Sequence, residues 1–229
     1  MVNNKQTKQK QQPKGKQNGK TSKASRGPGS GKSVGLTGAG ATFGAYVPTC
    51  TFSISSVGSG HIRVRGHEIL GNVIPPINQG TGYLAAVFDC NPASWRSSRL
   101  SLTAAGYERY RYNSARIRYV PAVPTTVAGS VALAVETDPD EQLPGGPDCI
   151  VRTMNAQTSG LSPAWGAVNM TFKRDAKDCE WYEASILNSP SLSSVSQFLV
   201  YVCADVPNQI ATTIGRVVIE YDLEFMYPE

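Results

Sequence analysis

Residues 215–225, GRVVIEYDLEF, carry apolar and charged side chains that alternate strictly from Ile219 onward. A period of two residues places successive side chains on opposite faces of an extended chain, so it is typical of a β-strand. The stretch therefore predicts a long strand close to the last residue of the sequence.

Seven further stretches have the composition of β-strands. Each is rich in β-branched, aromatic or alternating residues, and turn-forming pairs such as Asn91-Pro92 separate them. They are residues 61–65, 68–71, 83–88, 115–120, 130–136, 167–172 and 197–203. The 3.6-residue period is scarce, and only residues 99–107, preceded by the candidate N-caps Ser97 and Ser98, favour a short helix. About eight strands and many turns predict an all-β antiparallel sandwich or barrel.

The sequence before residue 45 has a different character. It is rich in Lys, Gln, Gly and Ser, and its large apolar residues are few. Such a segment buries too little apolar surface to offset its conformational entropy. We therefore expect residues 1–44 to form a disordered basic N-terminal arm and flexible connector, and residues 45–229 to form one domain with its own core.

Charge is divided sharply between these two parts. The chain has 229 residues and a formal net charge of +5, yet no acidic residue precedes Glu68. Residues 33–229 carry 13 basic and 17 acidic residues, a net charge of −4. The remaining +9 belongs to the arm and comes from Lys5, Lys8, Lys10, Lys14, Lys16, Lys20, Lys23, Arg26 and Lys32.

The irregular spacing of these nine cations suits a mobile chain that follows a phosphate backbone. Lysine and arginine bind phosphates with release of counterions, so binding should weaken as salt rises. Residues 1–42 contain no aromatic side chain, so stacking on bases contributes nothing there. We predict electrostatic RNA binding that is largely indifferent to sequence. A solubilising tail and a localisation signal are the alternatives.

Four carboxylates lie within six residues, directly after the predicted strand 130–136. They are Glu136, Asp138, Asp140 and Glu141. Calcium prefers several oxygen ligands on a bendable loop, and crowded carboxylates repel one another without a cation. The spacing is equally compatible with a solvated acidic turn, because the loop lacks the pattern of an EF-hand.

A second basic group, Arg109, Arg111, Arg116 and Arg118, lies in the body of the chain. Arg116 and Arg118 share one face of a predicted strand. Three roles stay open for the group: it faces RNA, it pairs with acids of a neighbouring subunit, or it forms a solvated strand face.

Patterns typical of enzymes and zinc sites are incomplete. Residues 29–33, GSGKS, end like a phosphate-binding loop, but Arg26 stands where that motif needs Gly. His61 and His67 are the two histidines, and both lie near the first predicted strand. The five cysteines are widely spaced, which argues against zinc and favours free thiols in a reducing compartment. We find no secretory signal and no run long enough to span a membrane, and we expect no enzyme.

The central third of the chain resembles a known family. Residues 107–112, YERYRY, are followed by RYVP at 118–121, TT at 125–126, GSV at 129–131 and ETDPD at 136–140. Together they are similar to the shell domain of coat proteins from small icosahedral positive-strand RNA plant viruses, such as sobemoviruses and tombusviruses. The resemblance extends more generally over residues 45–229, and the basic arm fits it.

The resemblance implies an eight-stranded jelly-roll sandwich whose identical copies assemble into an icosahedral shell, commonly with T=3 geometry. It implies that the arm packages genomic single-stranded RNA inside the virion, with assembly in the host cytoplasm and no membrane partner. The family often holds Ca²⁺ between subunits through acids after the corresponding strand. The matching positions here are Glu136, Asp138 and Glu141.

Two other classes of protein compete with a capsid protein. A non-viral RNA-binding protein with a β-barrel body would be expected to carry a basic excess on its folded domain, whereas this body has a net charge of −4. A β-sandwich enzyme such as a cupin needs a His/Glu metal set, which two histidines six positions apart do not supply. We therefore predict a capsid protein whose partners are RNA and its own copies.

Overall fold

The computed structural model describes residues 48–74, 83–95, 98–141, 148–175, 177, 180–184, 191–206 and 213–228. The predicted disordered arm, its nine cations and the domain boundary at residue 44 lie outside these residues. They stay predictions.

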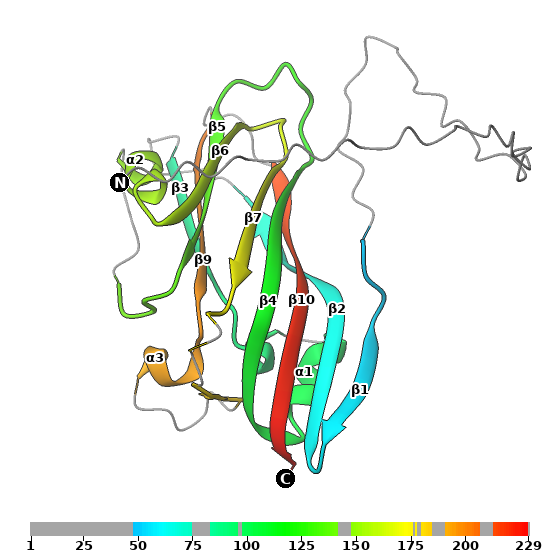
Figure 1. Cartoon of the computed structure of the whole chain (residues 1–229). Helices are drawn as coiled ribbons and strands as arrows, with labels where there is room; N and C mark the ends of the chain where they lie inside the picture. Colours follow the sequence, from blue (N-terminus) through cyan, green and yellow to red (C-terminus); the bar gives the residue numbers. More distant parts are fainter. Residues whose placement is uncertain are drawn as a thin grey trace, which may run out of the picture. The chain divides into compact units, whose positions relative to one another are not determined.

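Two antiparallel sheets form the body of the protein (Figure 1). The first sheet has the order β1 (Ser53–Gly58), β2 (His61–Val73), β10 (Gly215–Pro228), β4 (Tyr107–Pro121) and β7 (Val168–Lys173), and the short β8 (Tyr182–Glu183) pairs with the start of β4. The second sheet has the order β3 (Tyr83–Asp89), β9 (Leu199–Asp205), β5 (Ser130–Glu136) and β6 (Thr158–Pro163).

Eight of these strands make a jelly roll. Without β1 and the two-residue β8, the sheets read β2-β10-β4-β7 and β3-β9-β5-β6. The first of the eight strands thus pairs with the last, the second with the second-last, and each sheet holds four. Two four-stranded antiparallel sheets linked in this way are the jelly-roll sandwich. The predicted eight-stranded fold is confirmed.

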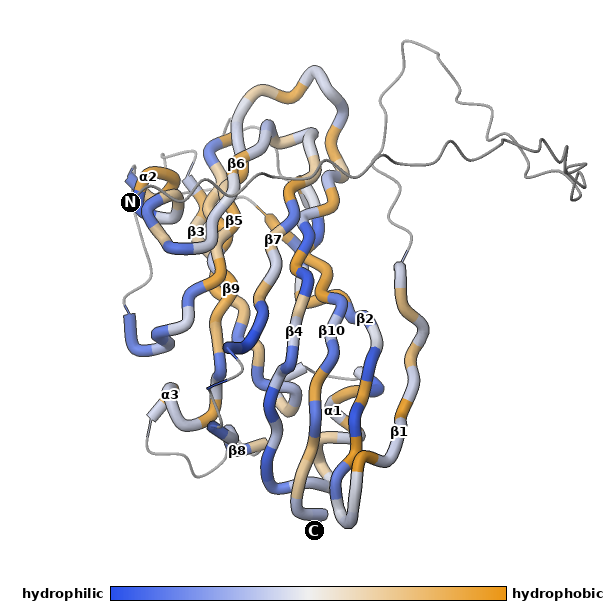
Figure 2. Tube along the Cα trace, in the orientation of Figure 1, coloured by the Kyte–Doolittle hydropathy of each residue, from blue (hydrophilic) through white to orange (hydrophobic). Residues whose placement is uncertain are grey.

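The strand predicted at residues 215–225 is β10, the centre of the first sheet. Val217, Ile219, Tyr221, Leu223 and Phe225 all point inward and are buried. In Figure 2 hydrophilic and hydrophobic residues alternate along β10, whereas β9 is hydrophobic almost throughout. Both faces of β9 are buried because one lies in the core and the helix α2 covers the other.

Short helices close the connections between strands. They are α1 (Arg99–Ala104), α2 (Cys149–Met154), α3 (Leu192–Val195) and the 3-10 turn η1 (Pro92–Ser94). The predicted helix corresponds to α1, and Ser98 is its N-cap, accepting a hydrogen bond from the backbone N–H of Ser101 at 2.9 Å. None of the helices in the described residues is long and apolar enough to cross a membrane.

The core holds buried tyrosines and thiols. Burial raises the pKa of Tyr110 and Tyr112 well above the ordinary tyrosine value, so both hydroxyls stay protonated donors. Cys90, Cys149 and Cys203 are buried free thiols, as the spacing of the cysteines predicted. Burial raises the pKa of Cys203 to about 12, which keeps this thiol neutral.

Candidate nucleic-acid interface and cation site

The predicted cation loop begins where β5 ends, at Glu136. Glu136 is half-buried, whereas Asp138 and Glu141 are exposed. The backbone N–H of Asp138 donates to Glu136 Oε1 at 3.0 Å, and that of Asp140 donates to Asp138 Oδ1 at 3.1 Å. Two of the acids therefore shape the turn by accepting backbone hydrogen bonds, and each retains a second carboxylate oxygen.

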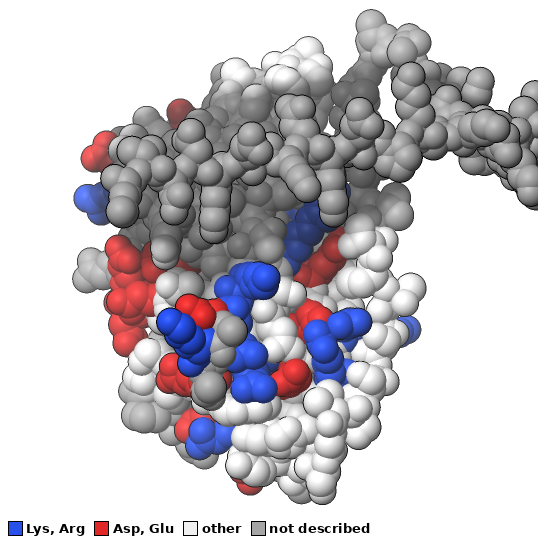
Figure 3. All heavy atoms as spheres, in the orientation of Figure 1, with Lys and Arg blue, Asp and Glu red and all other residues white. Residues whose placement is uncertain are grey.

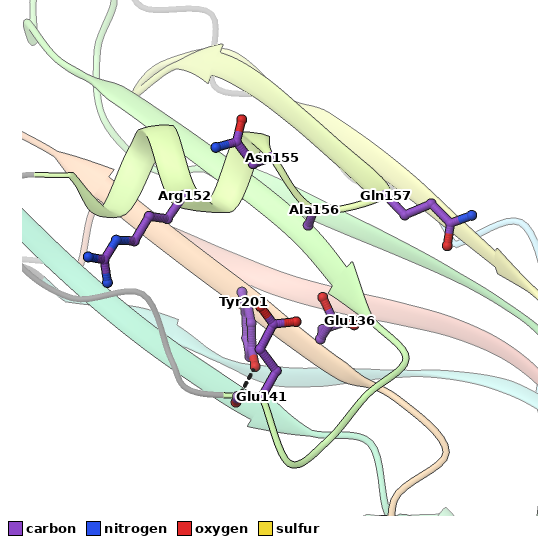
Figure 4. A pocket seen from close by; sticks show the side chains of 7 residues that line it. All are labelled: Glu136, Glu141, Arg152, Asn155, Ala156, Gln157 and Tyr201. Carbon is purple, nitrogen blue, oxygen red and sulfur yellow. Dashed lines mark hydrogen bonds between the residues drawn. The ribbon is translucent and has the colours of Figure 1, made fainter.

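Glu136 and Glu141 line a cavity of about 540 Å³, together with Arg152, Asn155, Ala156, Gln157 and Tyr201 (Figure 4). Tyr201 donates its hydroxyl to the backbone oxygen of Glu141 at 3.0 Å. Burial raises the pKa of Tyr201, and the nearby charges of Glu136 and Glu141 raise it further. Arg152 extends from α2 away from Glu136 (Figure 4). The cavity thus has carboxylates at one end and a guanidinium at the other.

The three predicted calcium ligands provide only part of a coordination sphere. Asp138 does not line the cavity that Glu136 and Glu141 share. Among the described residues, no group of three or more His, Cys, Asp or Glu side chains is placed to hold a metal ion. Since Ca²⁺ takes six to eight oxygen ligands, a calcium ion at this loop would need ligands from outside these residues.

Basic side chains gather on the outer face of the first sheet, with acidic side chains between them (Figure 3). Alternation along each strand turns the apolar residues inward and leaves the charged ones outward. The outward cations are Arg63 and Arg65 on β2, Arg109, Arg111, Arg116 and Arg118 on β4, Lys173 on β7 and Arg216 on β10. The second basic group of the sequence, residues 109–118, is therefore one part of a wider surface, which we call the basic face.

Three acids of β10 run through the middle of the basic face. Asp222 binds Arg63 and Arg65, with Nε to carboxylate distances of 2.6 and 2.9 Å. Glu224 binds Arg111 at 2.8 Å and accepts a hydrogen bond from Asn113 at 3.0 Å. The third acid is Glu220.

These ion pairs hold the acids charged. Burial alone would raise the pKa of Asp222 and of Glu224, but hydrogen bonds from the arginines outweigh it and leave both pKa values below the ordinary range. Arg111 also lies 4.1 Å from the ring centroid of Trp181, a cation–π contact. Arg111 thus pairs with an acid of its own chain, whereas the sequence had suggested an acid of a neighbouring subunit.

The folded domain begins on the same face. Thr49 donates its backbone N–H to Glu220 Oε1 at 3.2 Å and its hydroxyl to the other oxygen of that carboxylate. Cys50 donates its thiol to the oxygen of Gly66 at 3.0 Å, and its own carbonyl oxygen lies 3.0 Å from His67 Nδ1. The described part of the chain therefore begins on the basic face, where Thr49 bonds to β10 and Cys50 to β2.

Sequence reasoning did not find this anchor or the acids of β10. The period of two places residues 220, 222 and 224 on one face of the strand, so the sequence could have predicted a row of three acids there. Their partners depend on which strands lie next to β10, and no local pattern in the sequence fixes the strand order.

The eight-stranded jelly roll, in a chain whose residues 1–32 carry a net charge of +9, defines the class as a structural protein of the kind that builds virus shells. Comparison with known proteins agrees, because residues 52–229 match the family described as viral coat protein (S domain). The match covers most of the chain, and the chain belongs to this family.

Relatives and solved structures support the assignment. The capsid protein of Cucumber necrosis virus is 30% identical over 121 residues, which are 53% of this chain and 30% of that protein. The aligned region thus spans less than a third of this curated relative. The structure of tobacco necrosis virus has a TM-score of 0.66 at 18% identity and covers 80% of this chain and 90% of its own. That of Melon necrotic spot virus has a TM-score of 0.68 at 19% identity and covers 87% and 59%.

Family membership decides several predictions. The resemblance to virus coat proteins is confirmed, and the chain is a component of a virion. The family is structural, which sets aside the cupin-like enzyme and the non-viral RNA-binding protein. The identities to solved structures are low, so those structures establish the fold alone.

Proposed function

We propose that this protein self-assembles into an icosahedral shell, with T=3 geometry, and packages viral single-stranded RNA in the host cytoplasm. The observation that carries the proposal is the match of residues 52–229 to the viral coat protein family, on a chain whose eight strands have the jelly-roll order. Shell domains of this kind bury lateral surfaces against copies of themselves.

The arm supports the proposal of RNA packaging. Its nine cations give +9, while residues 33–229 carry −4. Crowding many such arms inside one shell is unfavourable until a polyanion neutralises them. RNA and protein would therefore assemble together, because RNA removes the repulsion between the arms.

Calcium at Glu136, Asp138 and Glu141 is a further part of the proposal. The loop lies at the end of β5, and Glu136 and Asp138 each keep a carboxylate oxygen that accepts none of the hydrogen bonds within the turn. A second copy of the chain would provide the remaining oxygen ligands. A bound Ca²⁺ would supply the positive charge that lets these carboxylates lie close to a neighbouring subunit.

The RNA content of purified particles tests the packaging role. Replacing the nine arm cations by Gln should give particles or subunits that protect little RNA from nuclease, read as a fall in the 260/280 nm absorbance ratio. A matched variant in which the eight arm lysines become Arg keeps the charge and should package RNA as the wild type does. If the Gln variant protects as much RNA as the wild type, the arm does not package RNA.

A further inference from the structure

We propose that the basic face is a second binding surface for RNA phosphates, and that the acids of β10 set its strength. The inference rests on the proposed packaging of RNA, and it adds a site in the folded domain to the site in the arm. The ligand is the phosphate backbone of single-stranded RNA, because the exposed charged donors described on this face are Arg and Lys side chains, which bind phosphate oxygens.

Four outward cations of the basic face are available to a ligand. Arg109, Arg116, Lys173 and Arg216 are exposed, and none of them makes an ion pair within the described residues. They lie on three adjacent strands, β10, β4 and β7. A single unpaired arginine is ordinary on a protein surface, but four exposed cations on one sheet face outnumber the three acids of β10 that lie between them.

The basic face has two hollows that are lined in part by its basic side chains. The first, of about 300 Å³, is lined by Arg65, Arg116, Ser114 and Thr171, with Asp222 and Glu220 beside them. Guanidinium and hydroxyl groups are the donors that phosphate oxygens accept from most often. The second hollow, of about 530 Å³, is lined by Arg216, His67, Glu68, Pro48 and apolar side chains of β2, β4 and β10.

The acids beside the first hollow are already occupied. Asp222 is bound by Arg63 and Arg65, and Glu220 accepts two hydrogen bonds from Thr49. Each ion pair has two effects: the arginine neutralises the acid, and the acid makes that arginine unavailable to the ligand. Arg63, Arg65 and Arg111 are masked in this way, whereas Arg116 stays available. The acids of β10 therefore weaken a surface that would otherwise carry three more cations.

The attachment of the arm favours RNA over an acidic surface of a second copy. Lys32, the last cation of the arm, precedes Pro48 by 16 residues. Sixteen residues span at most about 55 Å even when fully extended. Since Thr49 is fixed to Glu220 on the basic face, RNA held at Lys32 cannot lie farther than that from its point of attachment. The same RNA can therefore reach both sites.

Salt-dependent binding of a fluorescein-labelled 20-nucleotide oligouridylate to the full-length protein tests the proposal. Each phosphate contact on a single strand contributes about 0.7 to the slope of log K against log salt. The triple variant R116Q/K173Q/R216Q should lower the magnitude of the slope by about 2. Raising the salt from 50 to 200 mM should therefore weaken the binding of the wild type by a factor about 20 times larger than the factor for the variant. R152Q, which removes one cation from the helix α2 over the other sheet, is the control, and it should leave the slope unchanged.

Asp222→Asn provides the opposite test. It frees Arg63 and Arg65, so the slope should rise by about 0.7 to 1.4 and binding at low salt should tighten. Asp148→Asn removes the same charge from an exposed residue at the start of α2, where the side chain makes no capping hydrogen bond, and is the control. Glu224→Gln, which frees Arg111, repeats the test if D222N does not fold.

The outcomes separate this proposal from the packaging role of the arm. A wild-type slope in the triple variant, with binding lost when the nine arm cations become Gln, would overturn the sheet site and leave the arm's role intact. Unchanged binding in the arm variant would instead contradict the arm's role. If the triple variant keeps its slope but no longer self-associates in sedimentation, the basic face binds acids of a second copy and the proposal is wrong.

Discussion

Three tyrosines of β4 donate hydrogen bonds from their hydroxyls to backbone oxygens outside that strand. On β4, Tyr110 donates its hydroxyl to the oxygen of Val195 at 2.5 Å, and Tyr112 donates to that of Cys90 at 2.9 Å. Tyr119 lies 2.8 Å from the oxygen of Ala164 and 2.9 Å from that of Ile214. All three side chains are fully buried. Each ring fills the core while its hydroxyl donates to a carbonyl oxygen in a segment between strands.

Tyr119→Phe should therefore destabilise the domain by about 1–3 kcal/mol, because it removes the hydroxyl donor of the buried Ala164 oxygen, whereas the Ile214 oxygen still accepts the backbone N–H of Ala122 at 2.8 Å. The free energy of unfolding in urea measures the effect. Tyr227→Phe is the control, since Tyr227 is half exposed and should change stability by less than about 0.5 kcal/mol. Equal stability of the two variants would show that the hydroxyl of Tyr119 contributes nothing.

Asp222 gives a prediction for acid pH. Its pKa is lower in the folded protein than in the unfolded chain, so its ion pairs stabilise the fold above the ordinary aspartate pKa of about 3.9. That stability is lost as pH falls through the lowered pKa. D222N should be less stable than the wild type at pH 7, and its unfolding free energy should change less between pH 5 and 2. D138N should keep the wild-type profile, and a D222N profile parallel to the wild type would contradict the assignment.

The ion pairs of the basic face show where prediction from residues stops. Arg63 and Asp222 are 159 positions apart, and Arg111 and Glu224 are 113 apart. The alternation of each strand gave the face on which each side chain lies, but only the order β2-β10-β4 brings them together. The acids after β5 show the converse, because Glu136, Asp138 and Glu141 are close in sequence and still do not converge on one point.

At the scale of elements, strands were predicted where the period of two is unbroken. β5 was predicted with its observed bounds, Ser130–Glu136. β4 was predicted only from residue 115 and begins at Tyr107, because a bulge opposite Asp222 and Leu223 shifts the alternation. Tyr110 and Tyr112 point inward before the bulge, and Ala115 and Ile117 after it. The period therefore changes phase within one strand.

The strands β1 and β6 were not predicted for a different reason. Their sequences, SISSVG and TSGLSP, are dominated by Ser, Gly and Pro, which have low strand propensity. Both lie at the edge of the described sheets, where β1 pairs only with β2 and β6 only with β5. Pairing with a neighbouring strand stabilises β1 and β6, and this pairing cannot be recognised from the local sequence.

The helix α1 offers a test at the same scale. Ser98 caps its first turn through the side chain, whereas Ser191 at the start of α3 caps no backbone N–H. Ser98→Ala should cost about 1 kcal/mol and lower the melting temperature by about 2–4 °C. Ser191→Ala should leave it unchanged. Indistinguishable melting curves would show that the cap of α1 does not contribute to domain stability.

In the whole molecule, positive and negative charge are concentrated in different parts of the chain. Residues 1–32 carry +9, while the net negative charge of residues 33–229 includes the acidic loop after β5. Within the described residues, one sheet offers the cations of the basic face, and the other offers carboxylates beside an open cavity. This arrangement suits a wall with RNA on one side and with neighbours that add ligands to the loop.

Calcium removal gives a prediction for the particle. Without Ca²⁺, and with pH raised so that carboxylates are ionised, repulsion at Glu136, Asp138 and Glu141 should swell the shell. Dynamic light scattering before and after chelator at pH 7.5 would show a larger diameter for the wild type. The neutral variant E136Q/D138N/E141Q should keep one diameter in both conditions. If the diameter of the wild-type particle changes with neither chelator nor pH, the proposal of a calcium site at this loop is wrong.

The most direct test of the central claim is electron microscopy of the purified full-length protein mixed with single-stranded RNA. We predict closed isometric shells of one diameter, with RNA inside that resists nuclease. Monomers or small oligomers under every condition of salt, pH and calcium, with RNA left open to nuclease, would contradict the assignment of this chain as a protein that builds a shell around RNA.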